Sequence, residues 1–180
     1  IVERTKIQDK SESSEKLQYR DIAPTIAAGA TFSITLIVYL LTLAPDISWA
    51  FSAADGGELI TASVTLGVPH PPGYPLYTVV GKLASYFPLG TIAFRFNLLS
   101  ALCMAAAAGL LAFSVGSACC ANRSSNINIR LRGKDSFLSP PLWSGIFAGS
   151  LFAFTPIVWQ QAIVAEVYAL NMLVVCGFLA

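Results

Sequence analysis

The stretch from Ala44 to Asn97 reads APDISWAFSAADGGELITASVTLGVPHPPGYPLYTVVGKLASYFPLGTIAFRFN and lies between two long apolar runs. It holds an acidic pair, the only histidine of the chain, a Pro-Pro-Gly turn and an isolated arginine. Irregular backbone at a membrane is tolerated only in water or buried in protein. This polar loop, rich in glycine and proline, is therefore where we expect the chemistry of the chain.

Composition assigns the chain to the integral membrane proteins. Hydrophobic residues make up 55% of the 180 positions and charged residues 12%, and the mean hydropathy is +0.66. A soluble domain needs a more polar surface than this composition supplies. The net charge of +1 gives no basic stripe to meet phosphates, so we expect no nucleic-acid partner. The four cysteines show no metal-binding or disulfide spacing.

The apolar runs predict an all-α membrane protein with about four transmembrane helices. The run from Thr25 to Leu43 has 19 uncharged residues, enough to cross a hydrocarbon core of about 30 Å. We expect spans at about 25–43, 96–119, 142–159 and 168–180, with the last one truncated. Residues 24–180 would then be the membrane module and 1–23 a hydrophilic, flexible tail. Both chain ends look like cuts, so we expect a fragment of a longer protein.

One apolar segment is too short to cross. Residues 76–89 carry Lys82 in the middle and Pro88 near the end, so we expect a helix that lies at the membrane surface or re-enters.

Positive charge predicts the orientation. The tail carries five Lys and Arg residues and the loop at 122–140 carries four, against two in the central segment. Because positive loops favour the cytosol, we expect the tail and loop 120–141 to be cytosolic and loop 44–95 to be lumenal. Asn122 begins a formal glycosylation sequon in a loop placed in the cytosol, and we expect it to be unused.

The acidic pair is the first candidate for chemistry. Asp55 and Glu58 flank two glycines, so a tight turn can bring both carboxylates to one surface. A partly desolvated carboxylate has a raised proton affinity and can act as a general base. The same residues also fit a solvated turn.

Three further features add candidates. His70 begins His-Pro-Pro-Gly-Tyr-Pro, where Pro71 and Pro72 stiffen the backbone and the imidazole can donate a hydrogen bond to phosphate or sugar. Arg95 could pair with a lipid phosphate or extend to headgroups. Glu166 interrupts an uncharged stretch at the same membrane edge, which favours a functional role over a solvated helix cap.

These motifs occur in the order of a known family. DGGELITASVTLGVPHPPGYPLYTVVGKLA, then PLGTIAFRFNLLSAL, then TPIVWQQAIVAEVYALN resemble the amino-terminal part of the transmembrane O-mannosyltransferase family described by the domain of unknown function 2723, which belongs to the GT-C class. The resemblance covers Leu41 to the chain end. The family's first lumenal loop reads Gly-Asp-Ser-Gly-Glu, and here Ala54 and Gly56 replace the first Gly and the Ser. Asn97, Glu166 and Asn171 match further family positions.

The resemblance implies a function. GT-C enzymes transfer a sugar, here expected to be mannose, from a dolichyl-phosphate donor to Ser or Thr hydroxyls of secretory or membrane proteins, with inversion, in the endoplasmic reticulum. Asp55 would be the base, and Glu58 a second candidate base or an orienting partner. The expected substrate-binding residues are His70, Pro71, Pro72, Tyr74, Arg95, Asn97, Trp159, Glu166 and Asn171. Some GT-C enzymes use a divalent cation and others do not, and no ligand cluster here decides between them.

Two other functions remain open from the sequence. A transporter or flippase of lipid-linked sugars would also use intramembrane charges and broken helices, but it predicts interrupted spans at the bilayer midplane. A catalytically inactive scaffold is the other alternative, and the retained Asp55 and Glu58 argue against it.

Overall fold

The computed structural model describes residues 2–47, 55–125 and 139–180, without the side chains of 2–21 and 123–125. Ala54 of the family comparison lies outside the described residues. So do Arg130, Arg132 and Lys134, on which the predicted orientation partly depends.

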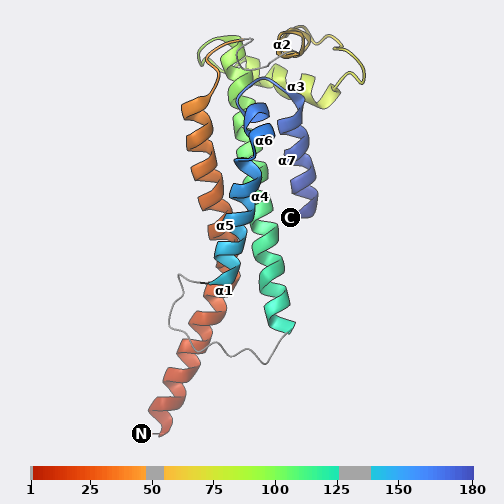
Figure 1. Cartoon of the computed structure of the whole chain (residues 1–180). Coiled ribbons are helices and arrows are strands. Elements are labelled where there is room, and N and C mark those ends of the chain that lie inside the picture. Colours follow the sequence, from red (N-terminus) through yellow and green to blue (C-terminus); the bar gives the residue numbers. More distant parts are fainter. Residues whose placement is uncertain (1, 48–54, 126–138) are drawn as a thin grey trace.

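Seven helices make up the described chain, and no strand occurs within those ranges. They are α1 (Val2–Thr42), α2 (Gly56–Thr65), α3 (Pro75–Ser85), α4 (Ile92–Ser125), α5 (Pro140–Ala153), α6 (Pro156–Ala162) and α7 (Val167–Leu179). Figure 1 shows α1, α4, α5, α6 and α7 side by side as an elongated bundle, with α2 and α3 lying across one end of it. We call residues 55–91 the cap. The all-α prediction is confirmed.

The predicted spans agree closely with the two longest apolar helices. The segments Ile22–Thr42 of α1 and Ile92–Asn122 of α4 are long and apolar enough to cross a membrane. These bounds lie within a few residues of the expected 25–43 and 96–119. The helix α1 also extends back to Val2 through the expected flexible tail. That tail is rich in Glu and Lys, which are good helix formers.

The third expected span is not one straight helix. Its two halves, α5 and α6, are bent by 71° relative to each other, and the pair could form one broken span or a re-entrant segment. Pro156 explains the break, because the residue before a proline is pushed out of the helical region. Thr155 accordingly has φ −60° and ψ 130°. The helix α7 begins where the fourth span was expected and is a shorter apolar helix.

Small residues let the bundle helices approach closely. A methyl group on Gly149 of α5 would lie 2.7 Å from the Ala108 carbonyl oxygen of α4, and one on Gly145 would lie 2.5 Å from that of Ala112. Such close packing is typical of helices in membranes. The buried Tyr39 hydroxyl of α1 donates to the Ala153 carbonyl at the end of α5, over 2.7 Å. The bundle is thus a rigid support for the cap.

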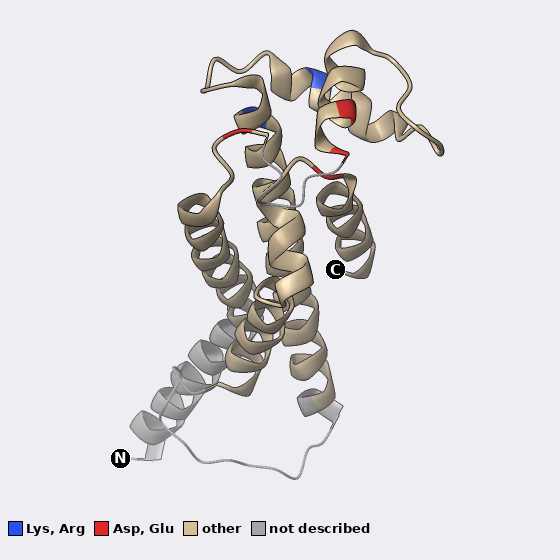
Figure 2. Cartoon of the chain, turned by 45° about the horizontal axis from the view of Figure 1, so that its top comes forward, with Lys and Arg blue, Asp and Glu red and all other residues tan. Residues whose placement is uncertain are grey.

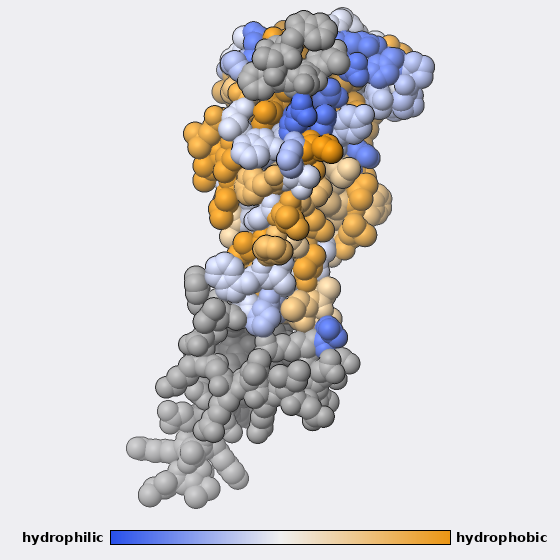
Figure 3. All heavy atoms as spheres, in the orientation of Figure 1, coloured by the Kyte–Doolittle hydropathy of each residue, from blue (hydrophilic) through white to orange (hydrophobic). Residues whose placement is uncertain are grey.

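The charged residues whose side chains the structure describes lie at the cap end of the bundle (Figure 2). Among residues with described side chains, the Asp, Glu, Lys and Arg residues are Asp46, Asp55, Glu58, Lys82, Arg95 and Glu166. Figure 2 shows all of these coloured segments at the α2–α3 end. In Figure 3 hydrophilic residues gather at that same end and hydrophobic ones cover the middle of the visible face. This distribution fits a membrane-embedded bundle with a polar end.

Candidate active site

The helix α2 carries both carboxylates of the acidic pair. Asp55 is the residue just before the helix and is exposed, while Glu58 lies in its first turn. Negative charge is favourable there because the first backbone N–H groups of a helix are unpaired. The Asp55 carboxylate has no hydrogen bond to any described residue, whereas Glu58 has two. The two carboxylates are therefore placed differently.

Glu58 is held by His70. The His70 backbone N–H donates to Oε1 over 2.6 Å, and Nδ1 of the ring lies 3.0 Å from Oε2. The hydrogen bond from the His70 ring, and then that from its backbone, lower the pKa of Glu58. Both side chains are about half exposed. Glu58 is thus kept ionised and in one position, which suits an orienting role better than that of a base.

The turn that brings His70 to Glu58 is determined by a few backbone conformations. Leu66 ends α2 in the left-handed conformation (φ 55°), and the Gly67 N–H returns to the Ala62 carbonyl over 2.8 Å. After the exposed Pro71 and Pro72, Gly73 has φ 91°, which glycine adopts readily.

Tyr74 completes this turn. Its ring lies edge-on to His70 with centroids 5.5 Å apart. The structure thus brings together Glu58, His70 and Tyr74 from the predicted site.

Glu166 approaches the same place from the bundle. It is the residue before α7 and is only 6% exposed, and its backbone N–H lies 3.4 Å from the Ser100 hydroxyl. Burial, and then the negative charge of Asp55, raise the pKa of Glu166, while the Val167 N–H and His70 act in the opposite direction. The charge of Asp55 thus disfavours the ionised form of Glu166. Glu58 and His70 therefore form a bonded pair at the cap, with Asp55 at the start of the same helix α2, and Glu166 lies buried just before α7.

Arg95 is engaged elsewhere in the cap. Its guanidinium donates to the carbonyl oxygens of Ser85 (2.6 Å), Leu89 (3.0 Å) and Gly90 (3.3 Å). Arg95 thus holds the turn between α3 and α4.

The other polar candidates also contact the scaffold or solvent. The buried Asn97 donates to the Ala44 carbonyl over 2.8 Å. The Trp159 ring N–H donates to the Thr42 hydroxyl over 3.0 Å. Asn171 is exposed on α7. The binding roles of these three residues stay predictions.

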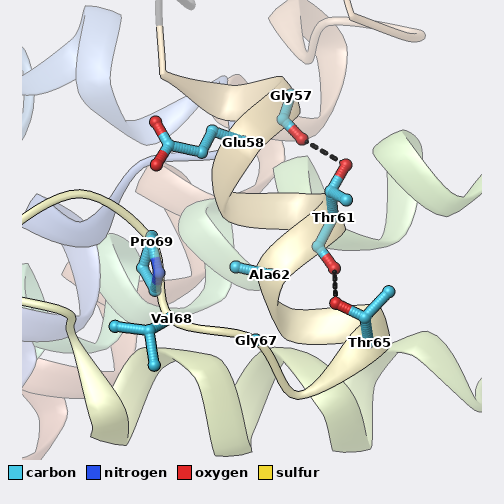
Figure 4. A pocket seen from close by; sticks show the side chains of 8 residues that line it. All are labelled: Gly57, Glu58, Thr61, Ala62, Thr65, Gly67, Val68 and Pro69. Atoms are coloured by element: carbon cyan, nitrogen blue, oxygen red, sulfur yellow. Dashed lines mark hydrogen bonds between the residues drawn. The ribbon is translucent and has the colours of Figure 1, made fainter.

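A shallow groove runs along α2 beside Glu58. It has a volume of about 430 Å³ and is lined by Gly57, Glu58, Thr61, Ala62, Thr65, Gly67, Val68 and Pro69. Figure 4 shows Glu58 at one end, facing Pro69, while the Thr61 and Thr65 hydroxyls bond to carbonyls within α2. The groove is open and largely apolar, and Glu58 is the one charged residue in its lining.

Two residues of α3 were missed by the sequence reading. Lys82 donates to the Val64 carbonyl in the last turn of α2 over 2.5 Å, which joins the two cap helices and complements the negative end of α2. Tyr77 is buried against α2 and α4. Tyr77 does not stand out in the apolar pattern of α3. The isolated charge of Lys82 was the one signal that the sequence offered for either residue.

The described residues do not assemble a metal site. No group of three or more His, Cys, Asp or Glu side chains within them could hold a metal ion. The chemistry that these residues offer is that of a carboxylate base with hydrogen-bonding partners.

Comparison with known proteins identifies the family. The profile described as "Protein O-mannosyl-transferase TMEM260 N-terminal domain" matches residues 55–179. A protein O-mannosyl-transferase TMEM260 of Mus musculus is 40% identical over 147 residues, which are 81% of this chain. One of Dictyostelium discoideum is 27% identical over 176 residues, 95% of this chain. The chain spans 18% of the length of each, and no solved structure matches it significantly. The match over 55–179 and the identity to the mouse protein show that the chain belongs to the TMEM260 N-terminal domain family.

Proposed function

We propose that this chain carries the catalytic base of a membrane glycosyltransferase that transfers mannose from a dolichyl-phosphate donor to Ser or Thr hydroxyls of proteins. The observation that carries the proposal is the exposed Asp55 carboxylate at the start of α2, on the same helix as the Glu58 that pairs with His70, at the polar end of an apolar bundle (Figure 2). The relatives are named protein O-mannosyl-transferases, which supports the sugar and the acceptor class.

Asp55 acts as the base in this proposal. Its carboxylate is exposed and makes no hydrogen bond to the described residues, so it can accept the proton of an incoming hydroxyl. The hydroxyl oxygen then attacks the anomeric carbon from the face opposite the phosphate, and the bond to the phosphate breaks. Such a single displacement inverts the anomeric centre, as the resemblance to the GT-C enzymes implies.

His70 is the better placed of the two candidate phosphate ligands. Nδ1 faces an ionised carboxylate and so acts as the donor in that contact. When the imidazole is protonated, Nε2–H can donate to the negative charge that develops on the leaving phosphate. Arg95 would first have to release its three carbonyl partners. Glu58 orients His70 in this arrangement.

The proposal includes a location. The positive charges of the tail and of loop 122–140 favour the cytosol, so the cap would face the lumen of the endoplasmic reticulum. There it would meet both lipid-linked sugars and secretory or membrane acceptor proteins.

One observation favours a second function. The 71° bend between α5 and α6 is a broken helix of the kind that transporters use. The described charged residues lie at the cap and not along the bundle, which favours the enzyme.

A transfer assay with purified full-length protein and labelled dolichyl-phosphate mannose distinguishes the glycosyltransferase from the transporter. We expect label on a protein acceptor, and none when GDP-mannose replaces the lipid donor. Absence of transfer, together with movement of the lipid-linked sugar across proteoliposomes, would overturn the proposal in favour of the transporter.

A further inference from the structure

Tyr77 carries a buried hydroxyl without a partner. The residue is 3% exposed, and its ring packs in a cluster formed by Leu59, Ile60, Ala93, Phe96 and Ala165. The ring centroids of Tyr77 and Phe96 are 6.3 Å apart, which fixes the ring between α3 and α4. Its hydroxyl makes no hydrogen bond to any described residue. A buried tyrosine hydroxyl usually finds a partner, so this one calls for an explanation.

Glu166 lies beside the same cluster. The residues on either side of it, Ala165 and Val167, both pack into the cluster that holds Tyr77. Burial, and then the negative charge of Glu166, raise the pKa of Tyr77. Tyr77 and Glu166 are thus both more than nine-tenths buried at one cluster, and no hydrogen bond joins the Tyr77 hydroxyl to Glu166.

The pair suits a ligand hydroxyl. A sugar hydroxyl both donates and accepts, so it can accept from Tyr77 and donate to Glu166 at the same time. A metal ion is a poorer match, because the described residues offer no group of three ligands. The acceptor hydroxyl is also a poorer match, because it must reach the exposed Asp55 and not the buried pair.

We propose that the Tyr77 hydroxyl and the Glu166 carboxyl form a buried subsite that binds hydroxyl groups of the donor's sugar, with Tyr77 as a specificity-determining residue. This inference rests on the proposed function, because it takes the ligand to be a lipid-linked sugar. Tyr77 is not a candidate base in this arrangement. It distinguishes a sugar-bearing lipid phosphate from a bare one.

The test measures binding to purified full-length protein. The probes are dolichyl-phosphate mannose and dolichyl phosphate, and the variants are Tyr77→Phe and Glu166→Gln. Tyr86→Phe is the matched control, because it removes a hydroxyl from a ring that follows the same helix and is 69% exposed. Tyr77→Phe should weaken binding of dolichyl-phosphate mannose by roughly tenfold and leave that of dolichyl phosphate unchanged. Glu166→Gln should act in the same direction, and Tyr86→Phe should change neither.

Stability and turnover separate the subsite from a structural role. Because the Tyr77 hydroxyl has no partner in the described chain, Tyr77→Phe should not lower the unfolding temperature without donor. In the transfer assay it should raise KM for dolichyl-phosphate mannose more than it lowers kcat. The subsite would be overturned if Tyr77→Phe weakened the binding of both lipids equally, left the binding of both unchanged, or lowered the unfolding temperature.

The subsite and the proposed function can fail separately. Transfer by the wild type together with an unchanged ratio of the two affinities in Tyr77→Phe would refute the subsite and uphold the glycosyltransferase. Absence of transfer together with the predicted loss of sugar-lipid binding would refute the glycosyltransferase and uphold the subsite.

Discussion

The bundle and the cap are stabilised in different ways. The bundle packs over long helical contacts through alanine and glycine, and its described spans contain no Asp, Glu, Lys or Arg apart from Arg95 near the cap end of α4. The cap consists of two short helices held by a few polar contacts, from Lys82, Arg95 and the Glu58–His70 pair. Packing along a bundle tolerates little change in volume, whereas polar contacts each fix one turn. The polar site at the cap is thus held by single contacts and rests on a closely packed apolar bundle.

The largest effect on folding is expected in the bundle. Gly149→Ala would place a methyl group 2.7 Å from the Ala108 carbonyl oxygen and 2.8 Å from the Thr31 methyl carbon. Because backbone cannot yield as a flexible side chain can, we expect a loss of about 2–3 kcal/mol in the free energy of unfolding. Denaturant unfolding of the full-length protein measures it.

Gly29→Ala in α1 is the control, since nothing lies within 4 Å of the added methyl group. Equal stabilities of the two variants would mean that the bundle is not closely packed at Gly149.

A smaller effect is expected at the base of the cap. Arg95→Lys keeps the charge but loses the planar fork that binds three carbonyl oxygens. We expect a loss of about 1–2 kcal/mol. Hydrogen exchange should speed up in residues 85–91 and stay unchanged in α5. Uniform exchange changes would contradict a local role for Arg95.

The confirmed part of the sequence prediction is the all-α membrane fold, which depends on composition and on the length of the apolar runs. Uninterrupted apolar runs predicted α1 and α4 because a hydrocarbon core requires a minimum length. The uncharged stretch around Pro156 predicted a third span at 142–159, and the structure adds a 71° bend between α5 and α6 within it.

Contacts to backbone atoms could not be predicted from the sequence. Arg95 and Asn97 were read as candidate ligands, but their partners are carbonyl oxygens, which every residue carries. The pairing of Glu58 with His70, twelve residues apart, depends on the left-handed turn at Leu66, for which no glycine or asparagine gave a signal.

Glu166 should make stability depend on pH. Its pKa is raised in the folded state, so the folded protein binds this proton more tightly than the unfolded one, and stability falls as pH rises from 4.5 through the raised pKa. Glu166→Gln should remove this dependence and raise the unfolding temperature at pH 7.5. The gain over the wild type should shrink toward pH 4.5. A loss of stability at pH 7.5 would mean that the carboxylate has a partner.

The smallest effect is expected at the turn of the cap. The lowered pKa of Glu58 means that its bonds to His70 are present at neutral pH and are lost as pH falls through that lowered value. Glu58→Ala should therefore speed hydrogen exchange of the His70 amide several-fold at pH 7, since that N–H loses its acceptor. Glu58→Gln retains an acceptor oxygen, so the exchange rate of the His70 amide in this variant should lie between those of the wild type and Glu58→Ala. Identical exchange in all three would show that the pair does not hold the turn.

The measurement that tests the central claim most directly compares Asp55→Asn with Asp46→Asn in the transfer of mannose from dolichyl-phosphate mannose by the full-length protein. Both carboxylates are exposed at the same end of the molecule, and among the described residues Asp46 accepts a hydrogen bond only from the backbone N–H of Ile47. If Asp55 is the base, its variant should lose roughly 10² to 10⁴-fold in rate at unchanged stability, and Asp46→Asn should keep the wild-type rate. Equal rates in both variants would contradict the assignment of catalysis to Asp55.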